Sequence, residues 1–267
     1  MKKSIYLIVL VVLVMSCSKK QPADLIPKHE SFTIESKYVN ETRTITVWTP
    51  PSYKNTDTSF PVLYMPDGGI NEDFPHIANT ISKLIKNKSI PPIILVGIKN
   101  TIRGRDLTGF SEVEKDAKYC PITDGAANFR SFITEELFIE ISKKYRVSNK
   151  KGIIGESLAD LFVIETLLLK PNSFDFYIAM DPSLWWNNHY LVSNSSALLK
   201  NFPDKKIKLW FAGSSAEDIS LYTNQLEKKI KKTAQNGLLW KYANEPNEKH
   251  NTIFRATKEK ALKWILN

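Results

Sequence analysis

Ser157 is the residue whose setting most clearly suggests chemistry. It follows the apolar segment KGIIGE and directly precedes LADLFVIET. A sharp turn from a strand into a helix exposes one side chain and directs the first helical N–H groups toward whatever that side chain attacks. Gly155 and Ala159 are small enough for such a turn. We therefore predict that Ser157 is a nucleophile, the alternative being an ordinary helix cap.

A nucleophilic serine needs a base, and the base needs an acid that orients it. His250 is the last of the four histidines and precedes the last predicted helix. Enzymes with this kind of turn carry the three residues in the order Ser, acid, His. We predict His250 as the base. The acid is expected after the segment KIKLWFAG and is either Glu217 or Asp218, with a slight preference for Glu217.

Acyl transfer also needs donors for the oxyanion of the tetrahedral intermediate. One predicted donor is the backbone N–H of Leu158, next to the nucleophile. The second is expected in the segment VLYMPDGG, where Gly68 and Gly69 allow the backbone to approach a ligand closely. The alternative interpretation of the two glycines is a simple turn.

Apolar periodicity indicates the elements that must position these residues. SFTIESKYV and TRTITVWTP alternate as half-exposed antiparallel strands do, whereas five later runs are almost wholly apolar, as in a buried parallel sheet. Helical patterns occupy residues 126–147, 158–170, 218–234 and 252–266. The sequence therefore predicts an α/β fold with a mostly parallel sheet, antiparallel N-terminal edge strands and helices on both faces.

The N-terminus resembles an export signal with a lipoprotein cleavage box. Residues 1–16 have two lysines and a short apolar run, and VMSC ends in Cys17. We expect a signal peptide over 1–16, lipidation (palmitate) of Cys17, a tether over 17–30 and one domain over 31–267. The expected location is the bacterial cell envelope, anchored to a membrane on the periplasmic side or in the outer membrane. A plain signal peptide is the alternative.

The composition limits the kinds of ligand and partner that the protein is expected to bind. The 267 residues carry a formal charge of +9, with the basic residues scattered along the chain, so nucleic-acid binding is not expected. Cys120 is the only other cysteine, and no zinc-ligand spacing is present. We expect no cofactor and no metal, and a small-molecule or glycan ester as substrate.

Several segments together resemble the putative-esterase family of the α/β-hydrolases, which includes esterase D-like and enterobactin-type siderophore esterases. The similarity covers residues 31–267 and is most specific from Gly155 to Trp186. There the chain has KP, FDF and DPSLWW where the family has KP, an aromatic–Asp–aromatic strand and SPSLWW. The resemblance implies the α/β-hydrolase fold and ester hydrolysis without a metal, with Ser157 as nucleophile and His250 as base.

The resemblance also singles out residues around the site. Arg103 and Arg105 lie in IRGRDL, which matches a motif at the family's active-site rim, so they are expected to bind substrate or to form a structural ion pair with Asp106. Trp185 and Trp186 are expected either to stack on a substrate or to pack in the core.

Two residues beside Ser157 depart from the family pattern. Glu156 stands where the family often has His, and Ala159–Asp160 replaces Gly-Gly. A charged Asp160 facing the site would oppose an oxyanion. Besides a serine carboxylesterase, the sequence is therefore compatible with an inactive binding protein and with an acyltransferase that uses the same triad. Siderophore esters, acetylated or feruloylated polysaccharides and small xenobiotic esters all remain possible substrates.

Overall fold

The computed structural model describes residues 24–233 and 237–267 and contains one sheet of eight strands. The strand order is β1-β2-β4-β3-β5-β6-β7-β8. The strands are β1 (Glu30–Ser36), β2 (Glu41–Trp48), β3 (Phe60–Met65), β4 (Ile94–Ile98), β5 (Val147–Glu156), β6 (Phe176–Met180), β7 (Ile207–Gly213) and β8 (Leu238–Asn244).

The sheet is antiparallel at one edge only. β1 pairs with β2 and β2 pairs with β4 in antiparallel register, and every other neighbouring pair is parallel. The central strands β3, β4 and β6 are almost wholly buried, whereas β1 alternates exposed and half-buried residues. This arrangement confirms the strand pattern and the mixed sheet that the sequence predicted.

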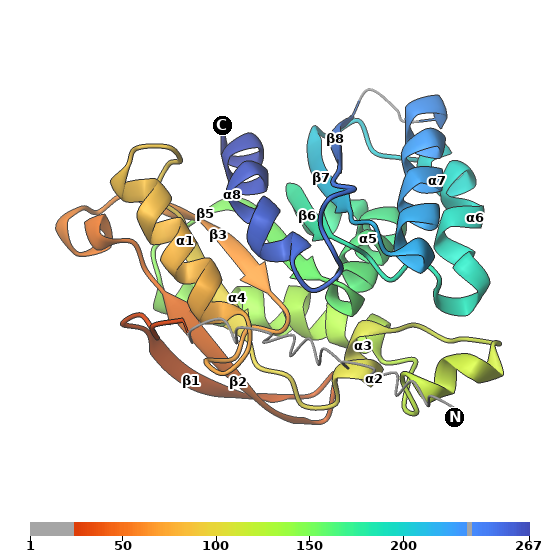
Figure 1. The fold of residues 1–267 in the computed structure, drawn as a ribbon. Helices are drawn as coiled ribbons and strands as arrows, with labels where there is room; N and C mark the ends of the chain where they lie inside the picture. The colour runs from red at the N-terminus through yellow and green to blue at the C-terminus, as the bar shows by residue number, and fades with distance from the viewer. Residues whose placement is uncertain (1–23, 234–236) are drawn as a thin grey trace, which may run out of the picture.

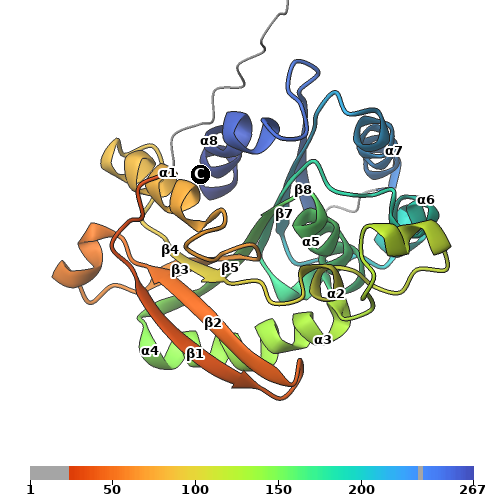
Figure 2. The same cartoon turned by 60° about the horizontal axis from the view of Figure 1, so that its bottom comes forward.

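Helices cover both faces of the sheet (Figures 1 and 2). Apolar side chains of α1 and α8 form one core with the sheet, and those of α3, α4, α5 and α6 form the other. The α-helices are α1 (Phe74–Lys86), α2 (Arg103–Leu107), α3 (Ala126–Ser131), α4 (Phe138–Lys144), α5 (Leu158–Leu169), α6 (Trp186–Lys200), α7 (Glu217–Thr233) and α8 (Ile253–Leu266). Four short elements complete the set: 3-10 turns η1 (Pro51–Asn55), η2 (Glu114–Lys118) and η4 (Pro171–Ser173), and the π-helix η3 (Phe132–Leu137).

The predicted helix over 126–147 is interrupted by η3. The apolar stripe of that helix recurs every four residues, from Phe129 through Ile133, Leu137 and Ile141 to Tyr145, and all five side chains are buried. A straight α-helix has 3.6 residues per turn, so a spacing of four drifts around its surface. The wider i→i+5 turn of a π-helix takes up the extra residues and keeps the stripe toward the sheet.

The predicted signal peptide, Cys17 and residues 17–23 of the predicted tether lie outside the described residues. The described end of the tether contacts the domain: Asp24 forms an ion pair with Arg255 at 2.5 Å, and the Leu25 carbonyl accepts a hydrogen bond from Asn79 at 2.7 Å. Within residues 24–233 and 237–267, no helix is both long and apolar enough to cross a bilayer.

Candidate active site

Ser157 lies between β5 and α5 in a backbone conformation that side chains rarely adopt, with φ 62° and ψ −114°. The helix folds back so tightly that a Cβ added at Gly155 would lie 2.8 Å from the Cβ of Ala159. Leu158 and Ala159 then begin a helix that is buried along its length. The strain is therefore held in place by packing on both sides of the serine, as in a nucleophile elbow.

A chain of two hydrogen bonds joins Ser157, His250 and Asp181. His250 Nε2 lies 2.9 Å from Ser157 Oγ, and His250 Nδ1 lies 2.8 Å from Asp181 Oδ2. When Nδ1 carries the proton, the imidazole donates to Asp181 and leaves Nε2 free to accept the serine proton. This is the geometry that general-base activation of a serine requires.

Asp181 is fully buried and held from a second side. It follows β6 directly with φ 59°, and it accepts hydrogen bonds from the Ser214 N–H and hydroxyl, each at 2.6 Å. Its own N–H donates to the Ala212 carbonyl at 3.0 Å. These contacts fix the carboxylate toward the imidazole and stabilise its charge inside the protein.

The prediction that Glu217 or Asp218 orients the histidine was wrong in this geometry. Both residues begin α7, and neither is hydrogen-bonded to His250; Asp218 acts on it only through its charge. The chain that leaves β7 uses Ser214 to bind Asp181 and turns into α7 beyond it. One sequence feature could have identified the acid: Asp181 directly follows the apolar strand that pairs with the strand before Ser157.

Local charges change the proton affinity of the site. The hydrogen bond to Asp181 raises the pKa of His250, and the charges of Asp181 and Glu156 add to this, against the opposing effect of partial burial. Burial, with a smaller contribution from the nearby Asp73, raises the pKa of Glu156 to about 7 against the opposing effect of His250. Glu156 and His250 therefore influence each other's titration across the neutral range.

The loop with Gly68 and Gly69 does not offer the predicted donors. The N–H of Gly68 donates to the Ile98 carbonyl at 3.0 Å, and the N–H of Gly69 donates to Glu72 Oε2 at 2.7 Å. Both predicted amides are thus already engaged. Leu158 agrees better with its predicted role, because it opens α5, where the first N–H groups lack carbonyl partners within the helix.

Gly68 is required here for close packing. A Cβ at Gly68 would lie 2.3 Å from the Cα of Gly97 on β4, and a Cβ at Gly97 would lie 2.2 Å from the Gly68 carbonyl oxygen. Only glycine at both positions permits this contact. The loop after β3 is therefore fixed against β4 beside the nucleophile.

Arg103 fastens the same loop. Its Nε and Nη2 each donate at 2.7 Å to the two carboxylate oxygens of Asp67, a bidentate pair that leaves the side chain 39% exposed. Asn100 also donates to Asp67. Arg103 thus pairs with Asp67 rather than with Asp106, and two of its nitrogens are already engaged.

Arg105 belongs to a structural network. It pairs with Glu41 and Asp106, each at 2.7 Å, and the fully buried Arg43 pairs with the same two carboxylates, each at 2.6 Å. Of the two alternatives considered for Arg105, the ion pair with Asp106 is the arrangement present. Arg43 carried no recognisable sequence signal, because it occurs in an alternating edge strand.

The two tryptophans have different environments. Trp186 is 4% exposed and its indole N–H donates to the Gly109 carbonyl at 3.2 Å, so it packs in the core. Trp185 is half-buried and lies 5.0 Å, centroid to centroid, from the exposed ring of Tyr119. Trp185 is close in sequence to Ser183, whose N–H donates to the Ser157 carbonyl at 3.1 Å. An aromatic pair therefore lies near the nucleophile.

Asp160 is buried in the first turn of α5 and does not face solvent. One carboxylate oxygen accepts a hydrogen bond from the Met180 N–H, and the other has no partner. Complete burial raises the pKa of Asp160 well above its ordinary value. This shift favours the neutral form of Asp160, which lacks the charge that the sequence suggested would oppose an oxyanion.

The strand order, the strained serine turn and the Ser157–His250–Asp181 hydrogen bonds define the α/β-hydrolase class. Comparison with known proteins agrees. The model of the family described as "Putative esterase" matches residues 36–266. The chain belongs to this putative-esterase family and is an esterase of the α/β-hydrolase type.

Individual relatives cover most of the chain. The ferri-bacillibactin esterase BesA of Bacillus subtilis is 26% identical over 254 residues, which are 85% of this chain and 86% of that protein. An IroE-like serine hydrolase from Shewanella oneidensis has a TM-score of 0.80 at 26% identity, covering 89% of this chain and 79% of that structure. The BES protein of Bacillus cereus shares the fold with a TM-score of 0.79 at 24% identity, covering 93% of this chain and 98% of that structure.

Proposed function

We propose that the protein is a serine carboxylesterase that works through Ser157, His250 and Asp181. The observation that carries the proposal is the pair of hydrogen bonds through His250, at 2.9 Å to Ser157 and 2.8 Å to Asp181. Ser157 Oγ attacks the ester carbonyl while His250 Nε2 takes its proton. The imidazolium is stabilised by the buried Asp181 and then protonates the leaving alcohol.

The N–H of Leu158 donates to the oxyanion that forms in this step. In the second half of the reaction, His250 removes a proton from water, the hydroxide attacks the acyl carbonyl, and Ser157 leaves with the proton returned by His250. The raised pKa of the buried Asp160 supports turnover rather than binding alone, because it favours the form that carries no charge beneath the nucleophile.

The substrate that this site favours is an ester with an aromatic acyl group, as in a siderophore ester. Support comes from the relatives, one of which is a ferri-bacillibactin esterase, and from the exposed Tyr119 beside Trp185. Stacking on these rings would contribute about 1 kcal/mol or more beyond area burial. Trp185→Ala should then raise the KM for a dihydroxybenzoyl ester severalfold while leaving the KM for an acetyl ester nearly unchanged.

The central test is hydrolysis of a short-chain p-nitrophenyl ester by the purified protein beside Ser157→Ala. Ser195→Ala is the control for loss of a serine hydroxyl elsewhere, since Ser195 is buried in α6, whereas Ser157 is half-buried between β5 and α5. The proposal expects turnover by wild type and control, background rates for Ser157→Ala, and fluorophosphonate labelling that disappears only in Ser157→Ala. A folded wild type that neither turns over nor labels would contradict it.

We further propose, from the N-terminal sequence, that the enzyme is lipid-anchored through Cys17 in the cell envelope. The support is the VMSC box after a short apolar segment. Metabolic labelling with a palmitate analogue should mark the wild type and not Cys17→Ser. Equal labelling of both proteins, or of neither, would count against the anchor.

A further inference from the structure

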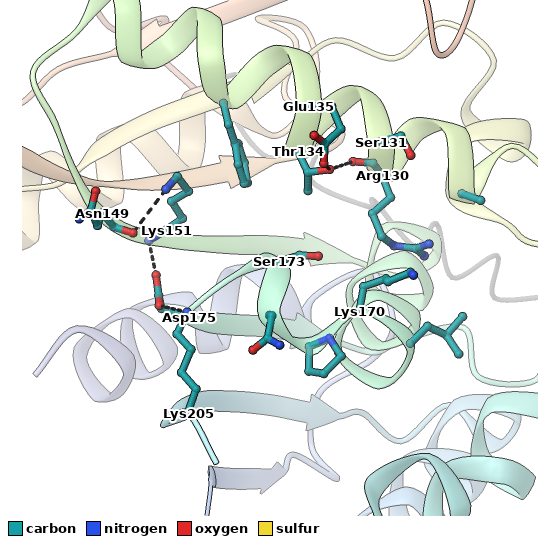
Figure 3. A pocket seen from close by; sticks show the side chains of 15 residues that line it. Arg130, Ser131, Thr134, Glu135, Asn149, Lys151, Lys170, Ser173, Asp175 and Lys205 are labelled. Atoms are coloured by element: carbon teal, nitrogen blue, oxygen red, sulfur yellow. Dashed lines mark hydrogen bonds and ion pairs between the residues drawn. The ribbon is translucent and has the colours of Figure 1, made fainter. Parts of the chain in front are cut away.

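A cavity of about 780 Å³, shown in Figure 3, is lined by residues from the N-terminal half of β5, whereas Ser157 follows the C-terminal end of that strand. The cavity wall includes Asn149 and Lys151 from this half of β5, Lys170 just after α5 and Asp175 just before β6. Ser157 lies six residues beyond Lys151, which is about 20 Å along an extended strand. The cavity is thus separate from the triad and has the size of a small-molecule site.

Positive charge in this cavity exceeds what its own carboxylates neutralise. Lys205 forms an ion pair with Asp175 at 2.6 Å, so these two compensate each other. The Lys170 ammonium has no hydrogen bond or ion pair with any described residue, and Lys151 Nζ has only the Asn149 carbonyl at 3.4 Å and the face of the Phe138 ring. Two ammonium groups therefore remain for a ligand.

Arg130 forms a fixed part of the wall. Its side chain is 8% exposed, its Nε donates to Thr166 at 2.9 Å, and its Nη2 donates to Glu165 at 2.5 Å, both on α5. Nη1 makes no hydrogen bond to a described residue. Figure 3 shows Arg130 from α3 and Lys170 from the end of α5 pointing toward each other. A buried guanidinium with a free N–H is a preorganised donor for an oxyanion.

The remaining lining suits an organic molecule rather than a bare ion. The hydroxyls of Ser131 and Ser173 have no partner in the described part of the chain and can donate. Phe138, Leu169 and Pro171 supply apolar surface in the same cavity. Small-molecule sites typically combine apolar walls with a few placed polar groups.

We propose that this cavity binds a small organic anion whose phosphate or carboxylate lies between Lys170 and Arg130, while Lys151, on the Asn149 side of the opening, adds positive charge to the same cavity. The apolar part of this anion packs against Leu169 and Pro171. Glu135 and Asp175 also line the cavity; Asp175 is paired with Lys205, and Glu135 is exposed and accepts a hydrogen bond from Thr134 at 3.0 Å. The ligand is not the ester substrate, because the cavity adjoins the N-terminal half of β5, whereas Ser157 follows its C-terminal end.

The test is calorimetric titration of the full-length protein with phenyl phosphate at low salt. Wild type should bind it, and Lys151→Gln/Lys170→Gln should bind at least tenfold more weakly. Lys241→Gln, an exposed lysine on β8 outside the cavity, is the matched control and should bind as wild type does. Inorganic phosphate should bind several-fold more weakly, benzyl alcohol should not bind, and added salt should weaken binding.

A second variant distinguishes a loss of ligand binding from a change in folding. Ala127→Glu adds a carboxylate to the cavity wall at an exposed helical position and removes no contact of the charged groups. It should also weaken binding at least tenfold, with an unchanged thermal unfolding midpoint in the absence of ligand. Absence of binding by wild type, equal affinity in the double variant, or inorganic phosphate binding as tightly as phenyl phosphate would each overturn the proposal.

Discussion

Ser157 and Asp181 each stand one residue beyond the last pair of two neighbouring parallel strands, because Glu156 pairs with Met180. Both residues have positive φ, 62° and 59°, and the Ser157 N–H donates to the Met180 carbonyl at 3.1 Å. The nucleophile and the acid are therefore positioned by the same strand pairing. His250, from the loop between β8 and α8, completes the set by bonding to both.

Asp181→Asn should lower kcat for p-nitrophenyl acetate by a factor on the order of 10³ to 10⁴, because an amide no longer stabilises the imidazolium or fixes its tautomer. Glu217→Gln and Asp218→Asn are the controls and should retain activity within about twofold. A larger loss in Glu217→Gln than in Asp181→Asn would contradict the assignment of the acid.

Glu156→Gln should shift the acid side of the pH–rate profile to lower pH. The base must be neutral to act, so kcat/KM rises as pH passes the pKa of His250, which Asp181 and Glu156 raise above its ordinary 6.5. A neutral glutamine removes one of the charges that favour the imidazolium. The measurement is kcat/KM from pH 5 to 9, with Glu217→Gln as control; an unchanged or higher acid limb in Glu156→Gln would disprove the coupling.

Asp160→Asn should stabilise the fold, and more so at pH 8 than at pH 4. Burial raises the pKa of Asp160 above its ordinary 3.8, so the folded state keeps a proton that the unfolded state releases, and stability falls as pH rises above that ordinary value. Asparagine has no proton to release. Urea unfolding at both pH values measures the effect, and the exposed Asp204→Asn should show no such difference. A gain independent of pH would show that Asp160 is not protonated in the fold.

Asp106→Ala should reduce the free energy of unfolding by about 3–5 kcal/mol. The buried Arg43 and its neighbour Arg105 each pair with Glu41 and Asp106, so the substitution leaves each arginine with only one carboxylate partner. Asp57→Ala, at an exposed position, should change stability by no more than about 0.5 kcal/mol. Chemical denaturation of both variants gives the comparison. Similar small losses in both would mean that Glu41 alone satisfies the arginines.

The fold followed from local patterns in the sequence, and the family followed from the resemblance of several segments to known esterases. Apolar runs that end in polar residues located the parallel strands, and the small residues around Ser157 located the turn. These signals are local because strand burial and turn sterics depend on adjacent residues. The putative-esterase family and the α/β-hydrolase fold were both predicted and are confirmed.

The orienting acid was missed because it depends on pairing between strands. Glu217 and Asp218 satisfy the expected chain order as well as Asp181 does. The register of β5 with β6 and the hydrogen bonds of Asp181 to Ser214 and His250 favour Asp181. The engagement of Gly68 and Gly69 by Ile98 and Glu72 depends in the same way on contacts between segments distant in sequence. The buried Arg43 likewise carries no local sequence signal. The four-residue apolar spacing that accounts for η3 is local, but it was interpreted as one uninterrupted helix.

Gly68 and Gly97, which pack backbone against backbone, limit the substitutions that this part of the active site can accept. A side chain at Gly68 meets the backbone of Gly97, and a side chain at Gly97 meets the backbone of Gly68, so no second substitution at the partner position can make room. Substitution of Gly68 or Gly97 therefore offers no route to a changed substrate specificity. A library for altered substrate range would keep both fixed and vary the exposed Ile70 and Ile102, which lie just beyond the same two strands.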